Sequence, residues 1–253
     1  LAPLYLQGAE AERVGEAKQG YVQLREILEH PKKNNLHARL VAELLLSEKE
    51  SPEEEIAAIV ACGEASIPSL LQLLQSDSFT STLFPGYGFA HELAAECLGR
   101  IGHHKALYPL FEQLGQGDFF AEEKTLRGLK ALGEPAKQFL LKKMQSLPYG
   151  EENIQAAMAL MEFAEDRIVS LAALELLQKE QILKYPVLFS YAVLLLGPVR
   201  DPILQGHFQA QLASLFVSSY IHLQFIMLRF LIFLGFFQYP QLFFQIQNYY
   251  SYF

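Results

Sequence analysis

The stretch Leu93–Gly102 reads LAAECLGRIG and continues directly into HHKALYPLFEQL at residues 103–114. Its apolar residues recur every three or four positions, which predicts an amphipathic helix with one buried face. Gly102 supplies the left-handed cap that ends such a helix. Pro109 then lies early in a second helix, where a missing backbone N–H is tolerated best. The stretch therefore predicts two helices joined by a short turn.

Stretches of the same design recur along the chain at intervals of 31 to 39 residues. The expected ends of their first helices are Gly63, Gly102, Gly133, Ala164, Gly197 and Gly235. A unit of this length holds two helices of about three turns, and each such hairpin keeps an apolar face exposed until a neighbour stacks on it. The repeats therefore predict an all-α fold, an α-α superhelix (α-solenoid) of about six helical hairpins and about thirteen helices, with no sheet.

We expect one continuous solenoid domain over residues 1–253. Its parts are N-terminal helices in 1–50, clear repeats in 51–178 and apolar C-terminal repeats in 179–253. The N-terminal helices are expected over residues 9–29 and 36–46, and Ser51 is the expected N-cap of the helix that follows, ahead of a proline and acidic residues. Residues 77–88 are rich in Ser, Thr, Gly and Pro, which predicts a loop inserted between two repeats.

The central unit resembles HEAT repeats of the short, phycobilisome-lyase-like class, whose pattern is AAEALGxIG, a short turn and AxPxLxxxL. The residues that carry the resemblance are Ala94, Ala95, Leu98, Gly99, Ile101, Gly102, Ala106, Pro109 and Leu110. The resemblance extends over Ile56–Leu177 and, more weakly, from Tyr191 onward. It implies the solenoid fold and leaves the activity open, because the same hairpin serves scaffolds, lyases and hydroxylases.

One subfamily of this class, the deoxyhypusine hydroxylases, is similar in fold and binds two irons through several His-Glu pairs at helix starts. Here His91-Glu92 matches that position once, and no other histidine precedes a glutamate. A di-metal site needs several converging ligands, so we expect no cofactor and read His103-His104 as polar turn residues. An enzyme or lyase-like chaperone (bilin-lyase-like or metal-dependent hydroxylase-like) that uses the region of His91 and Glu92 stays open as the alternative function.

The composition limits the partners of the chain. A net charge of −8 and a pI near 5.4 argue against nucleic acid, whose phosphates require a basic surface. Cys62 and Cys97 fall at apolar repeat positions, so we expect small core residues rather than a disulfide or a metal site. The few cysteines and the lack of a leader-like start favour the cytoplasm, and an exported form stays open because the chain starts at Leu1.

The C-terminal part is apolar and aromatic. Leu215–Phe237 is nearly long enough to span a bilayer, but Arg229 at mid-membrane would cost on the order of 3 kcal/mol. The spacing from Gly235 to Pro240 repeats that of the first stop and its proline, so we expect a terminal repeat rather than a membrane span.

These features predict a non-enzymatic scaffold that binds a protein partner. One candidate surface is the groove formed by the second helices of the hairpins, where Gln72, Gln113 and Lys142 occupy expected outward positions. The other is the apolar C-terminal end, a candidate for self-association or partner binding through Phe243, Phe244, Tyr249, Tyr250 and Phe253.

Overall fold

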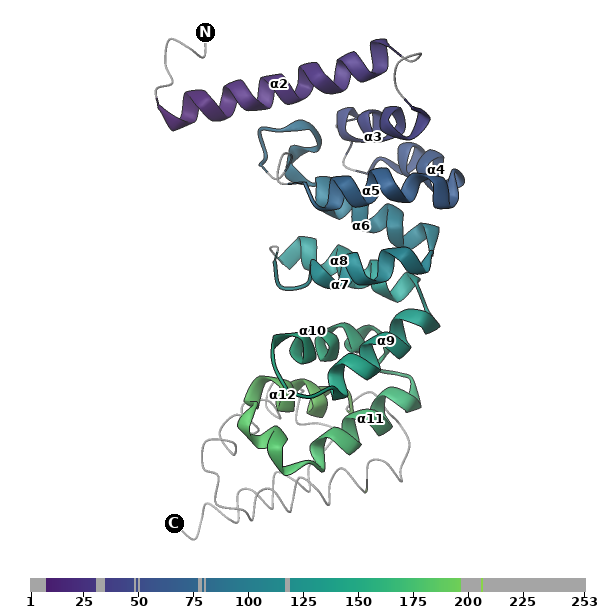
Figure 1. Ribbon diagram of the computed structural model, residues 1–253, viewed down its shortest axis with the longest axis vertical. Coiled ribbons are helices and arrows are strands. Elements are labelled where there is room, and N and C mark those ends of the chain that lie inside the picture. The colour runs from purple at the N-terminus through teal and green to yellow at the C-terminus, as the bar shows by residue number, and fades with distance from the viewer. Residues whose placement is uncertain are drawn as a thin grey trace. The chain divides into compact units, whose positions relative to one another are not determined.

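A computed structural model describes residues 8–30, 35–47, 49, 51–76, 79, 81–116, 119–196 and 206. Within this part of the chain the protein has eleven α-helices and no β-strand, which confirms the predicted all-α fold (Figure 1). The predicted stops at Gly197 and Gly235, the apolar segment Leu215–Phe237, and the candidate residues Phe243, Phe244, Tyr249, Tyr250 and Phe253 lie outside the described residues.

The chain divides into two compact units, residues 1–136 and 137–253. Unit 1 contains α2 (Ala9–Glu29), α3 (Leu36–Leu46), α4 (Glu53–Ala61), α5 (Ile67–Leu74), α6 (Ala90–Ile101), α7 (Leu107–Glu112) and α8 (Phe119–Ala131). The boundary falls inside α9 (Glu134–Gln145), and unit 2 continues with α10 (Glu151–Leu160), α11 (Arg167–Leu177) and α12 (Pro186–Leu194). The single superhelical domain predicted from the repeats stays a prediction.

Three of the predicted glycine stops are left-handed in the structure. Gly63, Gly102 and Gly133 have φ values of 57°, 70° and 67°. The N–H of Gly102 donates to the Leu98 carbonyl at 3.2 Å, which closes the last turn of α6. A residue with a Cβ would be strained at this φ, so glycine ends the helix here and lets the chain reverse into α7.

The stop predicted at Ala164 is formed differently. Ala164 lies at the expected end of the hairpin's first helix, but it has a right-handed backbone with φ −64° and ψ −18°. The chain turns through a short 3-10 segment, Met161–Phe163, and the side chain of Asp166 then accepts a hydrogen bond from the N–H of Ile168 at 2.9 Å. Because this N-cap starts α11 directly, the turn needs no left-handed residue.

The helix starts in unit 1 agree with their expected positions, with one correction. The bounds of α2 and α3 are those predicted, and Asn35 caps α3 by accepting from the N–H of Ala38 at 2.7 Å. Ser51 is not the N-cap of α4: Pro52 occupies that position, and the Ser51 hydroxyl donates to Glu53 at 3.3 Å. A rigid proline just before the first turn leaves Ser51 one residue too early to reach the free N–H groups.

Consecutive hairpins in unit 1 stack through their first helices, which are α4, α6 and α8. A close crossing joins α6 and α8, where a Cβ built on Gly99 would lie 2.6 Å from the Cα of Gly128. Ala94, Ala95 and Leu98 are fully buried on the same helix, so the contact is made by small residues with little room to spare. Such an approach requires glycine on both helices.

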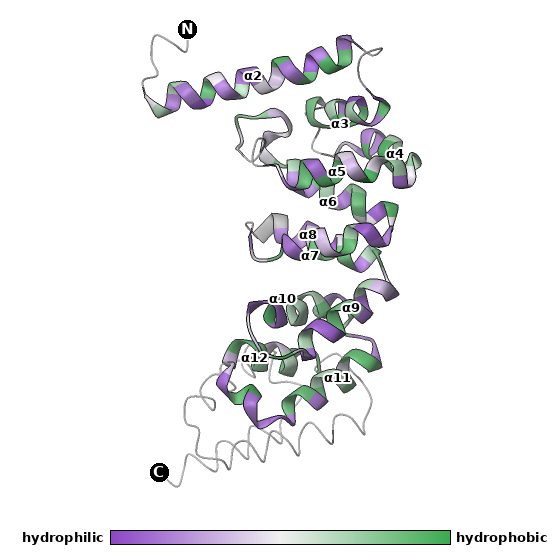
Figure 2. Cartoon of the chain, in the orientation of Figure 1, coloured by the Kyte–Doolittle hydropathy of each residue, from purple (hydrophilic) through white to green (hydrophobic). Residues whose placement is uncertain are grey.

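The outermost described helix of unit 1 is long and polar. Figure 2 shows hydrophilic residues along most of α2, and only Ala17, Gly20 and Leu24 of its 21 residues are buried. Since a terminal helix of a repeat stack packs on one side only, a polar outer face is what such a helix requires.

Unit 2 is held together by polar contacts as well as by its apolar core. Asn153 is 2% exposed, and its side-chain amide donates to the carbonyls of Lys143 at 2.8 Å and Ser146 at 2.8 Å, at the end of α9. Its side-chain oxygen accepts from the N–H of Gly150 at 2.7 Å. One buried side chain thus joins the end of α9 to the start of α10 and satisfies backbone groups that helix ends leave unpaired.

None of the described helices is by itself long and apolar enough to cross a bilayer. The segments Glu53–Ala61 and Gly63–Leu74 together have sufficient length and apolar character, but they are bent by 111° relative to each other.

Candidate functional site

Unit 1 contains a cavity of about 560 Å³ on the side of its first helices. Its walls come from α3, α4, α6 and α8 and from the segments that precede α4 and α6. The residues lining it are Leu44, Ser47, Lys49, Ser51, Pro52, Ile56, Gly86, Tyr87, Phe89, Glu92, Leu93, Glu96, Glu123 and Lys124. The volume lies in the range typical of ligand-binding clefts, and the mixture of apolar walls with a few converging charges is typical as well.

The rim of the cavity includes the end of the inserted loop, where three successive residues are left-handed. Gly86, Tyr87 and Gly88 have φ values of 76°, 54° and 85°. Two glycines adopt this conformation freely, whereas a tyrosine in it carries a strain of order 1 kcal/mol. Strain of this kind is found where a particular side-chain position is needed, and here it fixes the direction of Tyr87.

The loop is anchored on α3. A Cβ on Gly86 would lie 2.9 Å from a methyl group of Leu45, so the backbone passes in direct contact with this helix. The N–H of Phe89 donates to the carbonyl of Gly86 at 2.9 Å and closes the turn. The side chains of Tyr87 and Phe89 nevertheless remain 44% and 51% exposed. A firmly held backbone thus presents two aromatic rings at the cavity.

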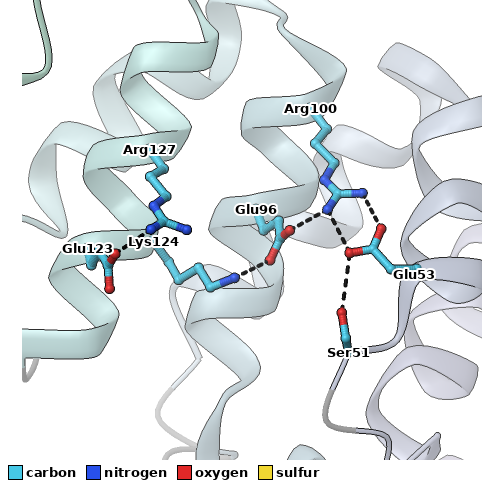
Figure 3. Close-up of polar contacts among 7 residues, drawn as sticks. All are labelled: Ser51, Glu53, Glu96, Arg100, Glu123, Lys124 and Arg127. Atoms are coloured by element: carbon cyan, nitrogen blue, oxygen red, sulfur yellow. Dashed lines mark hydrogen bonds and ion pairs between the residues drawn. The ribbon is translucent and has the colours of Figure 1, made fainter.

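A ladder of ion pairs crosses the three first helices beside the cavity (Figure 3). Arg100 on α6 donates to both carboxylate oxygens of Glu53 on α4, at 2.7 and 3.0 Å, and to Glu96 at 2.6 Å. Lys124 on α8 donates to the other oxygen of Glu96 at 2.7 Å. Glu96 lines the cavity and is therefore fixed by a cation from its own helix and by another from the next hairpin.

The ladder keeps the carboxylates of Glu53 and Glu96 charged at neutral pH. Burial raises the pKa of Glu96, but the hydrogen bonds from Lys124 and Arg100 outweigh it and leave the pKa below its ordinary value of 4.5. The hydrogen bond from Arg100 likewise lowers the pKa of Glu53. Paired and hydrogen-bonded charges can line a partly dry cavity, whereas isolated ones would be expelled or neutralised.

Two more charged residues of the walls, Lys49 and Glu123, are also paired. The ammonium group of Lys49 donates to Glu54 at 3.2 Å and to Glu55 at 2.8 Å, and these hydrogen bonds raise the pKa of Lys49. On α8, Glu123 is ion-paired with Arg127 one turn further along the helix. Both cations that line the cavity, Lys49 and Lys124, therefore already have carboxylate partners.

His91 and Glu92, which match the family's His-Glu position, have different surroundings. The Nε2 atom of His91 lies 2.8 Å from the carbonyl oxygen of Ser76, so this ring nitrogen carries the proton and donates it. Glu92 lines the cavity. Across the residues that the structure describes, no group of three or more His, Cys, Asp or Glu side chains could hold a metal ion.

His103 and His104 lie in the turn between α6 and α7, as expected. Their ring centroids are 4.3 Å apart, and Nδ1 of His103 accepts from the N–H of Lys105 at 3.2 Å. Glu64, from the preceding hairpin, is 3.7 Å from Nε2 of His103 and 2.6 Å from the ammonium group of Lys105. The contacts of this pair are thus those of a turn that is joined to the neighbouring hairpin.

The three groove residues differ in their exposure. Gln72 on α5 and Lys142 on α9 are exposed, while Gln113 is half-buried at the C-cap of α7. Gln72 and Gln113 belong to unit 1 and Lys142 to unit 2, so a groove shared by all three stays a prediction. The described residues of the cavity come from other elements: α5 and α7 contribute none of them.

Sequence reasoning missed the aromatic residues of the cavity, although a local signal for them exists. The loop ends in PGYGF, residues 85–89, where an aromatic residue between two glycines indicates a turn that presents a side chain. Lys49, Glu96 and Lys124 carry no comparable signal, because they meet only when three hairpins have stacked.

Comparison with known proteins does not assign a function to this site. The chain matches no protein-family model, and no curated protein is significantly similar to it.

Proposed function

We propose that the protein is a non-enzymatic interaction module that binds a protein partner through the cavity of unit 1. The observation that carries the proposal is the pair of half-exposed aromatic residues, Tyr87 and Phe89, at the rim of a 560 Å³ cavity. Aromatic side chains around a concave apolar surface are the feature most often associated with binding energy at protein interfaces. The resemblance of the hairpins to HEAT repeats is in keeping with this role.

Two further properties of the site favour binding over catalysis. The carboxylates of Glu53 and Glu96 are held charged by Arg100 and Lys124, whereas a general acid needs a pKa near the working pH. His91 uses its Nε2 proton in a hydrogen bond to a backbone carbonyl, which fixes the ring. These groups shape and support a surface rather than provide a proton donor. The groove residues and the C-terminal aromatic residues remain additional proposed contact surfaces.

A site-specific photocrosslink tests this function. The photoreactive residue p-benzoylphenylalanine replaces Phe89, which is 51% exposed at the cavity, or Val22, which is 46% exposed on α2, away from the cavity and from the second helices, and serves as the matched control. In native extract we expect a discrete crosslinked protein with the probe at position 89 and none with the probe at position 22. Excess unlabelled wild-type chain should compete for it, and a chain carrying Tyr87→Gly and Phe89→Ala should not. Equal labelling at both positions, or none at either, contradicts the proposed function.

A further inference from the structure

The inserted loop at the rim of the cavity rests on α2, a helix that is held by few buried contacts. We propose that α2 is a strap: docked, it holds the loop that bears Tyr87 and Phe89, and undocked, it releases the loop and dismantles the rim. This inference rests on the proposed function, because it names a regulation of the same site.

The helix meets the base of the loop at Gly20. A Cβ on this glycine would lie 3.4 Å from a ring carbon of Phe79, 3.5 Å from Pro85 and 3.8 Å from Phe84. The rings of Phe79 and Phe84 meet edge to face with their centroids 6.4 Å apart, so they form one apolar step against the helix. The residue after Pro85 contacts α3, so the base of the loop is held by two helices.

Two tight turns carry this anchorage to the rim. The N–H of Tyr87 donates to the carbonyl of Phe84 at 3.0 Å, and the N–H of Phe89 donates to the carbonyl of Gly86 at 2.9 Å. Tyr87 also has a left-handed backbone, which persists only while the surrounding structure enforces it. Release of the loop base would therefore let Tyr87 relax, and both rings would leave the positions they hold at the cavity.

The strap itself has a small buried face. Only Ala17, Gly20 and Leu24 of its 21 residues are buried, so Leu24 is its one large buried side chain, whereas six of the 12 residues of α6 are buried. The start of α2 has no side-chain cap, and the acidic Glu26 and Glu29 are unfavourable at the negative end of the helix dipole. A segment with so few buried contacts opens locally, without unfolding of the whole unit.

Hydrogen exchange of the full-length protein tests the coupling between α2 and the loop. Leu24→Asp places a charge on the buried face of α2 and should undock it, whereas Val22→Asp places the same charge where the side chain is already 46% exposed. With Leu24→Asp we expect the amides of Tyr87 and Phe89 to exchange at least tenfold faster and the amides of α6 to keep their wild-type rates. With Val22→Asp all of these rates should equal those of the wild type.

A second variant acts in the opposite direction and decides the matter if Leu24→Asp unfolds the whole unit. The methyl group added by Gly20→Ala would meet Phe79, Pro85 and Phe84 at ordinary contact distances, and alanine favours the helix. It should slow exchange in α2 and in the loop together, each by about threefold. Unchanged exchange of the loop amides in this variant, or in a folded Leu24→Asp protein, overturns the inference, because α2 and the loop then move independently.

The photocrosslink at position 89 links the strap to the proposed function. Its yield should fall at least fivefold when Leu24→Asp is added and should be unchanged when Val22→Asp is added. An undiminished crosslink in a folded Leu24→Asp protein overturns the regulation and leaves the proposed function intact. A lack of crosslink in the chain without these substitutions contradicts the proposed function instead, and the exchange rates still decide whether α2 holds the loop.

Discussion

Replacement of Gly99 by alanine tests the close contact between α6 and α8. The added Cβ would lie 2.6 Å from the Cα of Gly128 and 3.2 Å from its carbonyl oxygen, while ordinary contact begins near 3.4 Å. Both groups belong to the backbone of α8, so no side chain can rotate away. The two helices must separate by about 0.8 Å at the crossing, and overpacking of this kind costs about 1–3 kcal/mol.

The same substitution also has a favourable part, which a matched variant measures. Alanine is better than glycine inside a helix by about 0.5–1 kcal/mol. Gly15 lies in α2, where an added Cβ would meet no atom within 4 Å, so Gly15→Ala should show this gain alone. The net expectation is a loss of about 1 kcal/mol for Gly99→Ala and a gain of about 0.5–1 kcal/mol for Gly15→Ala.

Urea unfolding followed by far-UV circular dichroism measures both variants. With a slope near 2 kcal/mol per molar urea, the midpoints of the two variants should differ by about 1 M, with the wild type between them. Equal slopes would show that both variants report on the same cooperative transition. If Gly99→Ala stabilises the protein as much as Gly15→Ala does, the close crossing of α6 and α8 is refuted.

Three further predictions concern single side chains. Asn153→Ala should lower the free energy of unfolding by about 2–3 kcal/mol in urea titrations, because buried backbone groups at the end of α9 lose their partner. The lowered pKa of Glu96 stabilises the folded protein at pH values above 4.5, the ordinary pKa of a glutamate, and this stabilisation is lost as the pH falls through the folded-state pKa. Thermal unfolding of Glu96→Gln should therefore depend less on pH in the acid range than that of the wild type. Burial raises the pKa of Cys97 to about 12, so iodoacetamide at pH 8 should modify Cys97 only after unfolding, as mass spectrometry of the digested protein would show.

The glycine pattern predicted the hairpins well because it reports local physics. A left-handed residue at the end of a helix strongly favours glycine, and Gly63, Gly102 and Gly133 all have that conformation. At Ala164 the chain has no glycine, and it turns there through a 3-10 segment, with the following helix started by an aspartate cap. Sequence reasoning thus located this turn but did not indicate how it is formed.

The candidate site could not be predicted from the sequence, because its residues come together only when the helices pack. The inserted loop was predicted from its composition, but its contact with Leu45 depends on how α3 packs against it. Likewise, Glu53 and Arg100 are 47 residues apart in sequence, and nothing near either residue indicates that they meet. A charge pattern on a single helix predicts a solvated face; only the stacking of hairpins turns such faces into a cavity wall.

The glycine crossing and the cavity are mechanically coupled. Glu96 precedes Gly99 by about one turn of α6, and Lys124 precedes Gly128 by about one turn of α8, so the crossing sets the distance across which these two charges pair. Separation of the helices by Gly99→Ala would lengthen the 2.7 Å contact between Glu96 and Lys124 and loosen that wall of the cavity. The pKa of Glu96 would then be lowered less, so the unfolding of this variant should depend less on pH in the acid range than that of the wild type, although Gly99 does not line the cavity. Gly15→Ala should leave that pH dependence unchanged, because its added methyl group meets no neighbouring atom.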